Sequence, residues 1–566
     1  METAEVSIHG ALAALRGRLS GVQYPLEVSD AEDARTTRRD LLAQLDDYIL
    51  PRLDQLDAPL LAVVGGSTGA GKSTLVNSLV RRKVSDAGVL RPTTRSPVLV
   101  HHPDDIGWFD ELRVLPDLPR VAIHDQAGGA LRLVADDGLP AGVAILDAPD
   151  VDSVVTENRT LAAQLLAAAD LWLFVTTAAR YSDAVPWDFL RAAAERQAAV
   201  AVVLDRVAPE SVSEVRAHLA SMLAEHGLAD APLLVVEETA PDDSGLLPEE
   251  AVASVRAWLD GLAADESARN EIVRRTLDGA IGGALRRLPK LADAADNQVA
   301  TLTRLRDEIA HVYGKTAKRI DAASADGSML RGEVLARWQD FVGTGDFMRS
   351  LEAKVGRLRD KVTAFLRGRP QPAAAVEEAI ESGVAAMIVE EANRAAEKAD
   401  GKWRDSAAGR ALLAGDDLSR TAADLPTRSA ATVREWQDAV LEMVRAEGAD
   451  KRFNARLLSF GVNGLGLALM IVVFASTAGL TGAEVGVAGG TAVVGQKLLE
   501  AFFGDEAVRR LTARARADLS QRVEELLRTE SARFTDRLGG LPVEAGAGDA
   551  LRAALVTVEQ AREDAA

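Results

Sequence analysis

The chain contains no cysteine, which excludes disulfide bonds, thiolate metal sites and cysteine nucleophiles. Aromatic residues make up only 4% of its 566 residues. Acidic residues outnumber basic ones, which gives a formal net charge of −20. Such an acidic chain is not expected to have a nucleic-acid partner. The N-terminus shows no basic segment followed by an apolar core, so no secretory signal is expected. The abundant alanine, leucine and arginine favour helix, and the length allows several domains.

Short apolar runs alternate with amphipathic segments between Leu60 and about Ala264. This alternation predicts an α/β domain with a mostly parallel sheet and helices on both faces. The stretch 112–140 fits the alternation poorly and is interpreted as an extra hairpin. The predicted strands are Leu60–Val64, Val98–His101, Val143–Leu146, Leu171–Thr176, Val200–Leu204 and Leu233–Val236, and the predicted helices are Glu157–Ala168, Ala184–Ala198, Ser211–His226 and Glu249–Ala263.

The segment GSTGAGKS, Gly66–Ser73, follows the first predicted strand and precedes a predicted helix. In this context the pattern G-x-x-x-x-G-K-S predicts a phosphate-binding loop, because its amide hydrogens and the helix N-terminus both attract phosphate oxygens. Lys72 is expected to reach the β- and γ-phosphates, and the Ser73 hydroxyl to ligate Mg²⁺. The residues predicted to bind nucleotide here are Gly66, Ser67, Thr68, Gly69, Ala70, Gly71, Lys72, Ser73 and Thr74.

Two further segments are predicted to complete the metal site. The strand Val143–Leu146 ends at Asp147, which places a carboxylate beside the metal. The loop before the second strand contains Thr93 and Thr94, of which Thr94 is favoured as the residue that completes Mg²⁺ coordination and senses the γ-phosphate. The predicted metal ligands are therefore Ser73, Thr94 and Asp147, and the predicted catalytic residues are Lys72, Thr94 and Asp147.

The sequence departs from the usual GTPase patterns at two positions. Asp150 stands where the pattern D-x-x-G has a glycine that contacts the γ-phosphate. A carboxylate in that place repels phosphate unless a cation or a rotation intervenes. After the strand at 200–204, Asp205 and Arg206 occupy the first two positions of N/T-K-x-D, and both are predicted to bind the nucleotide. Its last position is Ala208, so guanine specificity is not secured by this motif.

The second half of the chain has a different character. Residues 265–451 show no strand signal and carry apolar residues at three- and four-residue spacing, which predicts a bundle or stalk of long helices. Breaks are expected at Ser324–Ser328 and at 370–372. The predicted domains are N-terminal helices forming a neck at 1–58, the P-loop domain at 59–264, the helical stalk at 265–456, a membrane hairpin or paddle at 457–503, and C-terminal helices at 504–566 that return to the stalk and neck. The helices before 59 are expected to pack beside the helix ending near Ala264.

One long segment of the chain is apolar and uncharged. Leu457–Ala483 has no charged residue and is long enough to span a bilayer, and Val485–Gln496 forms a shorter second run. Basic residues flank the pair on both sides, which predicts a hairpin in the cell membrane with both termini and the P-loop domain in the cytoplasm. The alternative is a helical hairpin buried within a protein core. The flanking residues are Lys451, Arg452, Arg456, Lys497, Arg509 and Arg510.

Taken together, several segments resemble the dynamin-like GTPases of actinobacteria. They are GSTGAGKST, RPTT, LDAPDVDSV, DLWLFVTTAARYSDAVPW, VVLDRV and the apolar segment that starts at Phe460. The resemblance implies a GTPase head, a helical stalk and a membrane-binding tip, with GTP and Mg²⁺ as ligands. It also implies assembly on a lipid bilayer, as a homo-oligomer or with a dynamin-like paralogue. Some relatives act in pairs at division septa during sporulation, so septum proteins are candidate partners.

Two hypotheses follow from these observations. The first is a membrane-anchored dynamin-like GTPase that hydrolyses GTP and remodels or stabilises the membrane. The alternative is a nucleotide-binding membrane scaffold that hydrolyses little and recruits partners, which Asp150 favours. An ABC-type ATPase is excluded, because Asp147 is followed by Ala148 and not by the glutamate that such enzymes use as a base.

Overall fold

The computed structural model describes residues 7–85, 97–109, 115, 118–121, 130–150, 156–195, 198–326, 371–447 and 504–565. The chain divides into two compact units, each described by itself: unit 1 consists of Met1–Tyr24, Ser29–Asn297 and Val543–Ala566, and unit 2 of Pro25–Val28 and Gln298–Pro542. No helix in the described ranges has both the length and the apolar character needed to cross a bilayer. The predicted membrane hairpin at 457–503 lies outside the described residues.

Unit 1 contains an eight-stranded sheet in the order β3-β4-β2-β5-β1-β6-β7-β8. Every neighbouring pair is parallel except β2 and β5, so the prediction of a mostly parallel sheet is confirmed. Each predicted strand is present, within a few residues at its ends. The strands are β1 (Leu60–Gly66), β2 (Val98–His101), β3 (Arg120–Val121), β4 (Leu131–Ala135), β5 (Val143–Asp147), β6 (Leu171–Thr177), β7 (Ala199–Val207) and β8 (Leu233–Glu237).

The extra hairpin expected within 112–140 is wrong. A hairpin needs antiparallel neighbours, whereas β3 and β4 pair in parallel and β4 pairs in parallel with β2. The sheet is thereby extended at its β2 edge. This placement buries Leu131 in the same apolar core as Leu99, which explains why β4 joins the sheet.

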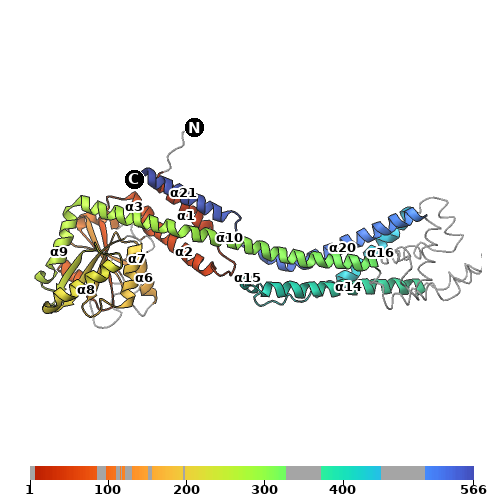
Figure 1. The fold of residues 1–566 in the computed structure, drawn as a ribbon, viewed down its shortest axis with the longest axis horizontal. Coiled ribbons are helices and arrows are strands. Elements are labelled where there is room, and N and C mark those ends of the chain that lie inside the picture. Colours follow the sequence, from red (N-terminus) through yellow and green to blue (C-terminus); the bar gives the residue numbers. More distant parts are fainter. Residues whose placement is uncertain are drawn as a thin grey trace, which may run out of the picture. The chain divides into compact units, whose positions relative to one another are not determined.

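Helices cover both faces of the sheet, as the alternation predicted, and Figure 1 shows them around the strands. Neighbouring residues of a strand point to opposite faces, so Leu61 and Val63 contribute to one core while Ala62 and Val64 contribute to the other. The first core receives α5 (Ile106–Phe109), α6 (Thr156–Ala167), α7 (Ala184–Glu195) and α8 (Val212–Glu225), and the second receives α4 (Lys72–Leu79) and α9 (Glu249–Ala264). Short 3₁₀ helices, η2 (Pro103–Asp105) and η3 (Pro209–Ser211), precede α5 and α8.

A separate cluster of helices completes unit 1. It is built from α1 (Ile8–Gly21), α2 (Ala31–Gln44), the π-helical turn η1 (Leu45–Ile49), α3 (Leu50–Asp54), the beginning of α10 (Glu266–Asp326) and α21 (Ala547–Ala565). The N-terminal helices therefore pack against α10 and α21, not against the helix ending near Ala264. That helix, α9, already buries its apolar face on the sheet through Val252, Val255 and Leu259.

A buried carboxylate, Asp170, connects this cluster to the sheet just before β6. Its Oδ1 atom is 3.0 Å from Nε of Arg52 and accepts a hydrogen bond from the Tyr48 hydroxyl at 3.2 Å. Its Oδ2 atom accepts the backbone N–H of Leu61 in β1 at 2.9 Å, and its backbone carbonyl accepts the Thr276 hydroxyl of α10 at 2.9 Å. Both members of the ion pair are almost fully buried, with side-chain exposures of 8% for Arg52 and 3% for Asp170. One carboxylate thus binds groups from α3, η1 and β1.

The described residues of unit 2 are mostly helical, apart from Pro25–Val28 and the short connections between the helices. It contains α10 from Gln298 onward, α14 (Gln371–Arg404), α15 (Ala407–Leu412), α16 (Leu425–Glu447) and α20 (Asp505–Gly539). The structure describes α10 as far as Asp326 and α14 from Gln371 onward, so the breaks predicted at Ser324–Ser328 and 370–372 fall at the limits of the described residues and stay predictions.

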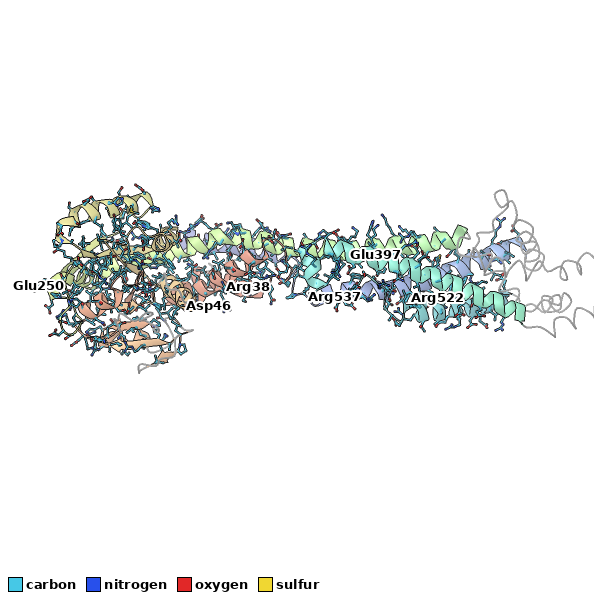
Figure 2. The ribbon with its side chains drawn as sticks, turned by 90° about the horizontal axis from the view of Figure 1, so that it is seen from below. Arg38, Asp46, Glu250, Glu397, Arg522 and Arg537 are labelled. Atoms are coloured by element: carbon cyan, nitrogen blue, oxygen red, sulfur yellow. The ribbon has the colours of Figure 1, made fainter. Side chains whose placement is uncertain are left out.

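The core of unit 2 contains the fully buried side chains of Trp403, Trp436 and Phe534. The Trp436 indole N–H donates to the carbonyl of Ala515 at 2.8 Å, which satisfies its polar atom inside the core. Figure 2 labels Arg522, which forms an ion pair with Glu435 of α16 at 3.0 Å.

Candidate functional site

The predicted phosphate-binding loop lies between β1 and α4, at the carboxyl end of the sheet's central parallel strands. Its backbone requires glycine at two places. Gly66 has φ of 147°, and a Cβ atom there would lie 2.1 Å from the carbonyl oxygen of Val175. Gly71 has φ of 95° and is the N-cap residue of α4, and a Cβ atom there would lie 2.3 Å from Oδ2 of Asp205. The glycines of the motif are thus required by the close approach of β6 and β7.

The Lys72 side chain folds back over its own loop. Its ammonium donates to the carbonyl oxygens of Gly66 at 2.9 Å and Ser67 at 3.1 Å. It also forms an ion pair and hydrogen bond with the carboxylate of Asp150, the residue that departs from the D-x-x-G pattern. Lys72 is only 5% exposed, so these three acceptors define its surroundings. The cation needed beside Asp150 is therefore supplied by the loop itself.

Ser73 and Asp147, two of the predicted metal ligands, lie side by side. The Ser73 hydroxyl donates to Oδ2 of Asp147 at 2.6 Å, and the Ser85 hydroxyl donates to the same oxygen at 2.5 Å. Asp147 is fully buried, and this burial raises the pKa of its carboxyl group, against the opposing effect of the two hydroxyl donors. Its other oxygen, Oδ1, is buried and has no hydrogen-bond partner within the described ranges.

These residues fit a magnesium ion. A carboxylate and a hydroxyl are oxygen ligands, which Mg²⁺ prefers, and it commonly takes one or two protein ligands while phosphates and water supply the rest. The unpartnered Oδ1 atom of Asp147 is a buried polar atom that such an ion, or one of its waters, would satisfy. The described residues include no group of three or more His, Asp or Glu side chains able to hold a metal. Thr93 and Thr94 lie outside the described residues, so the prediction for Thr94 stays open.

Asp205 and Arg206, the two residues predicted to border the base, meet the loop at Gly71. A Cβ atom at Gly71 would lie 3.4 Å from Nη2 of Arg206, besides its close contact with Asp205. Arg206 adopts a left-handed backbone with φ of 56°, and its N–H donates to Oδ1 of Asp205 at 2.9 Å. Its side chain is 51% exposed, which leaves its stem available to cover a base. Burial raises the pKa of Asp205 to about 6, although the nearby Arg206 acts to lower it.

We expect Asp205→Asn to become more stable relative to the wild type as the pH rises. The folded-state pKa of about 6 exceeds the ordinary value of 3.8, so the folded chain holds this proton more tightly than the unfolded chain. That contribution is complete below about pH 4, and it is lost as the pH rises through about 6. The full difference corresponds to roughly 3 kcal/mol at most. Calorimetric unfolding at several pH values measures it, with Asp188→Asn, an exposed carboxylate of α7, as the control. A stability difference that does not change with pH would contradict the expectation.

Two residues at the site were not found from the sequence. Ser85 donates to Asp147, and Arg180, just after β6, donates to the carbonyl oxygen of Thr68 in the loop at 2.6 Å. Arg180 also forms an ion pair with Asp183 at 3.3 Å. Its place at the carboxyl end of a strand beside β1 was a usable signal, because binding residues gather at that edge of parallel sheets.

The edge where a base would lie is formed by β7 and β8. Ala208, which stands where the guanine-binding Asp is usual, lies between β7 and η3. The neighbouring strand β8 was predicted from Leu233–Val236 and pairs in parallel with β7. The N–H of Glu238 donates to the carbonyl of Val207 at 3.0 Å, which brings the segment after β8 beside Ala208.

Comparison with known proteins gives structural similarity only. No protein-family model matches the chain, and no curated protein sequence matches it either. Among solved structures, it is similar to a chain of an oligomerised bacterial dynamin pair described as sensing and tethering membranes, with a TM-score of 0.42 and 9% identity over 100% of this chain and 95% of that chain. It is also similar to the bacterial dynamin GTPase LeoA from ETEC, with a TM-score of 0.24 and 13% identity over 99% of this chain and 98% of that one.

A third similarity is confined to part of the chain. Toc33 from Arabidopsis thaliana, in complex with Mg²⁺ and GMPPNP, aligns with 40% of this chain and 91% of its own length, with a TM-score of 0.24 and 16% identity. All of these values are low.

Proposed function

We propose that this chain is a dynamin-like GTPase that binds GTP with Mg²⁺, hydrolyses it and acts at a membrane. The observation that carries the proposal is the arrangement at the end of β1 and β5. Lys72 and Ser73 of a complete phosphate-binding loop face Asp147, with Ser73 Oγ 2.6 Å from Asp147 Oδ2. Lys72 and the loop amides would hold the phosphates, while Ser73 and Asp147 would hold Mg²⁺, which supplies positive charge against them. Thr94 is proposed as a further metal ligand and catalytic residue.

The membrane part of the proposal is supported by the sequence. The uncharged run Leu457–Ala483, flanked by basic residues, is proposed to anchor the chain in the cell membrane as a hairpin, with both termini in the cytoplasm. Nucleotide-dependent assembly, with copies of this chain or a dynamin-like paralogue, and a role at division septa follow from the motif resemblance alone. They are proposed on that basis.

A second function is favoured by one observation. Asp150 stands in place of the usual glycine, and its carboxylate accepts a hydrogen bond from the Lys72 ammonium. A chain whose phosphate-binding lysine is paired in this way would suit a nucleotide-binding membrane scaffold that hydrolyses little and recruits partners.

Turnover of GTP and ATP, measured with and without liposomes and with and without Mg²⁺, tests the proposal. We expect Mg²⁺-dependent hydrolysis of GTP. We also expect a preference over ATP well below about a thousandfold, because Ala208 cannot supply the carboxylate that reads guanine. Stoichiometric binding without turnover under every condition would favour the scaffold. A preference of about a thousandfold or more would show that another residue reads the base.

A further inference from the structure

The ammonium group of Lys72 has no hydrogen left for a phosphate. A lysine ammonium carries three donors and no acceptor. In this structure those donors face the Gly66 carbonyl, the Ser67 carbonyl and the Asp150 carboxylate. A nucleotide whose phosphates bind Lys72 must therefore replace at least one of these partners.

Asp150 is the partner that a phosphate would replace. The carbonyls of Gly66 and Ser67 belong to the loop itself, and Gly66 is held within β1, which pairs with β6. Asp150 lies outside the loop, three residues past Asp147 at the end of β5, and its side chain is 19% exposed. Of the three acceptors, it alone carries a formal charge. A carboxylate and a terminal phosphate both seek the same ammonium, and two anions in one place repel each other.

We infer that Asp150 acts as an internal anion on Lys72, a positioning residue that holds the lysine ammonium and that the terminal phosphates of a nucleotide must displace. The inference rests on the proposed nucleotide binding. Only molecules in which Asp150 has left Lys72 are competent to bind nucleotide. The ion pair therefore reduces the apparent affinity to the intrinsic affinity multiplied by the fraction of competent molecules. Movement of the Asp150 carboxylate away from Lys72 then becomes an obligatory part of binding. A glycine at this position has no carboxylate, so it would neither lower the apparent affinity nor have to leave Lys72 before the nucleotide binds.

Nucleotide affinity of Asp150→Asn is the first test. Asparagine keeps the size of the side chain and an acceptor oxygen, but it removes the charge. We expect a non-hydrolysable GTP analogue with Mg²⁺ to bind about tenfold or more tightly to this variant, measured by calorimetry on the full chain. The control is Asp136→Asn, which changes a buried carboxylate of the same sheet domain whose ion-pair partner is Arg82 at 2.8 Å and not Lys72. Its affinity should equal that of the wild type.

Chemical labelling of Lys72 without nucleotide is the second test. An amine-reactive acetylating reagent, read by mass spectrometry, should modify Lys72 faster in Asp150→Asn than in the wild type or Asp136→Asn, because the ammonium loses its counter-charge. Equal affinity with equal labelling, or weaker nucleotide binding by Asp150→Asn, would overturn the inference. If none of the three proteins binds nucleotide, the proposed function and the displacement step fail together, while the labelling rate still reports whether Asp150 holds Lys72.

Discussion

Lys72→Ala should weaken nucleotide binding strongly and leave the fold intact. Lys72 is the ammonium proposed to contact the terminal phosphates, and its removal would leave their charge without this partner. Loss of one member of a buried charge pair costs about 2–5 kcal/mol, which corresponds to a weakening of roughly thirtyfold to several-thousandfold. Calorimetric titration with a GTP analogue and Mg²⁺ measures this loss.

The fold should survive because Lys72 contributes polar contacts to the loop and little apolar packing to the sheet. A matched control is Lys83→Ala, which removes an exposed lysine shortly after α4 and should bind like the wild type. Nucleotide affinity that is unchanged by Lys72→Ala would contradict the interpretation of Gly66–Ser73 as a phosphate-binding loop. A loss of circular dichroism in the variant would show that Lys72 supports the fold.

Deletion of Leu457–Val494 should release the protein from membranes while nucleotide binding is retained. The deleted run contributes no residue to the described site, which is built from β1, α4, β5 and β7. A single charge gives a sharper version of the test. Val472→Arg places a guanidinium within the uncharged run, at an insertion cost of about 2.5–3.5 kcal/mol, whereas Val472→Leu keeps the run apolar.

Fractionation of cell membranes, followed by nucleotide-binding measurements on the soluble and membrane fractions, tests all three variants. We expect the deletion variant to be in the soluble fraction and Val472→Arg to shift partly toward that fraction. Val472→Leu should remain with the membranes. A deletion variant that stays on membranes would show that the run is a core hairpin and that another part of the chain holds the protein there.

The sequence predicted the parts of the fold that depend on local patterns. The run Val143–Leu146 is apolar throughout because β5 is buried on both faces, so its strand could be recognised without the structure. The phosphate-binding loop was equally local, since its spacing and its strand and helix are contiguous. The direction of β4 was not local, because it depends on which edge strand accepts it, and the expected hairpin failed for that reason.

The site was predicted where residues follow a strand and missed where contacts join distant segments. Asp147 ends β5 and Asp205 lies two residues before the end of β7, so the sequence could place both at the carboxyl edge of the sheet. The contact between Lys72 and Asp150 joins residues 78 positions apart, and the sequence indicated only that Asp150 needed a cation. Ser85 lies 62 positions from Asp147, and no motif marks it.

The contacts of Asp170 determine which segments a fragment must include for the P-loop domain to fold independently. A fragment that begins at Pro59 would lack Tyr48 and Arg52 and would leave the Asp170 carboxylate buried without its ion-pair partner, at a cost of about 3–5 kcal/mol. A fragment that ends at Ala264 would also lose Thr276, whose hydroxyl accepts the N–H of Ala199 at the start of β7. The smallest autonomous form of the head therefore includes the N-terminal helices and the first turns of α10. A change that loosens the helix cluster would weaken the contacts of Asp170 and thereby disturb β1 and β6. These two strands pair at Gly66, where the phosphate-binding loop begins.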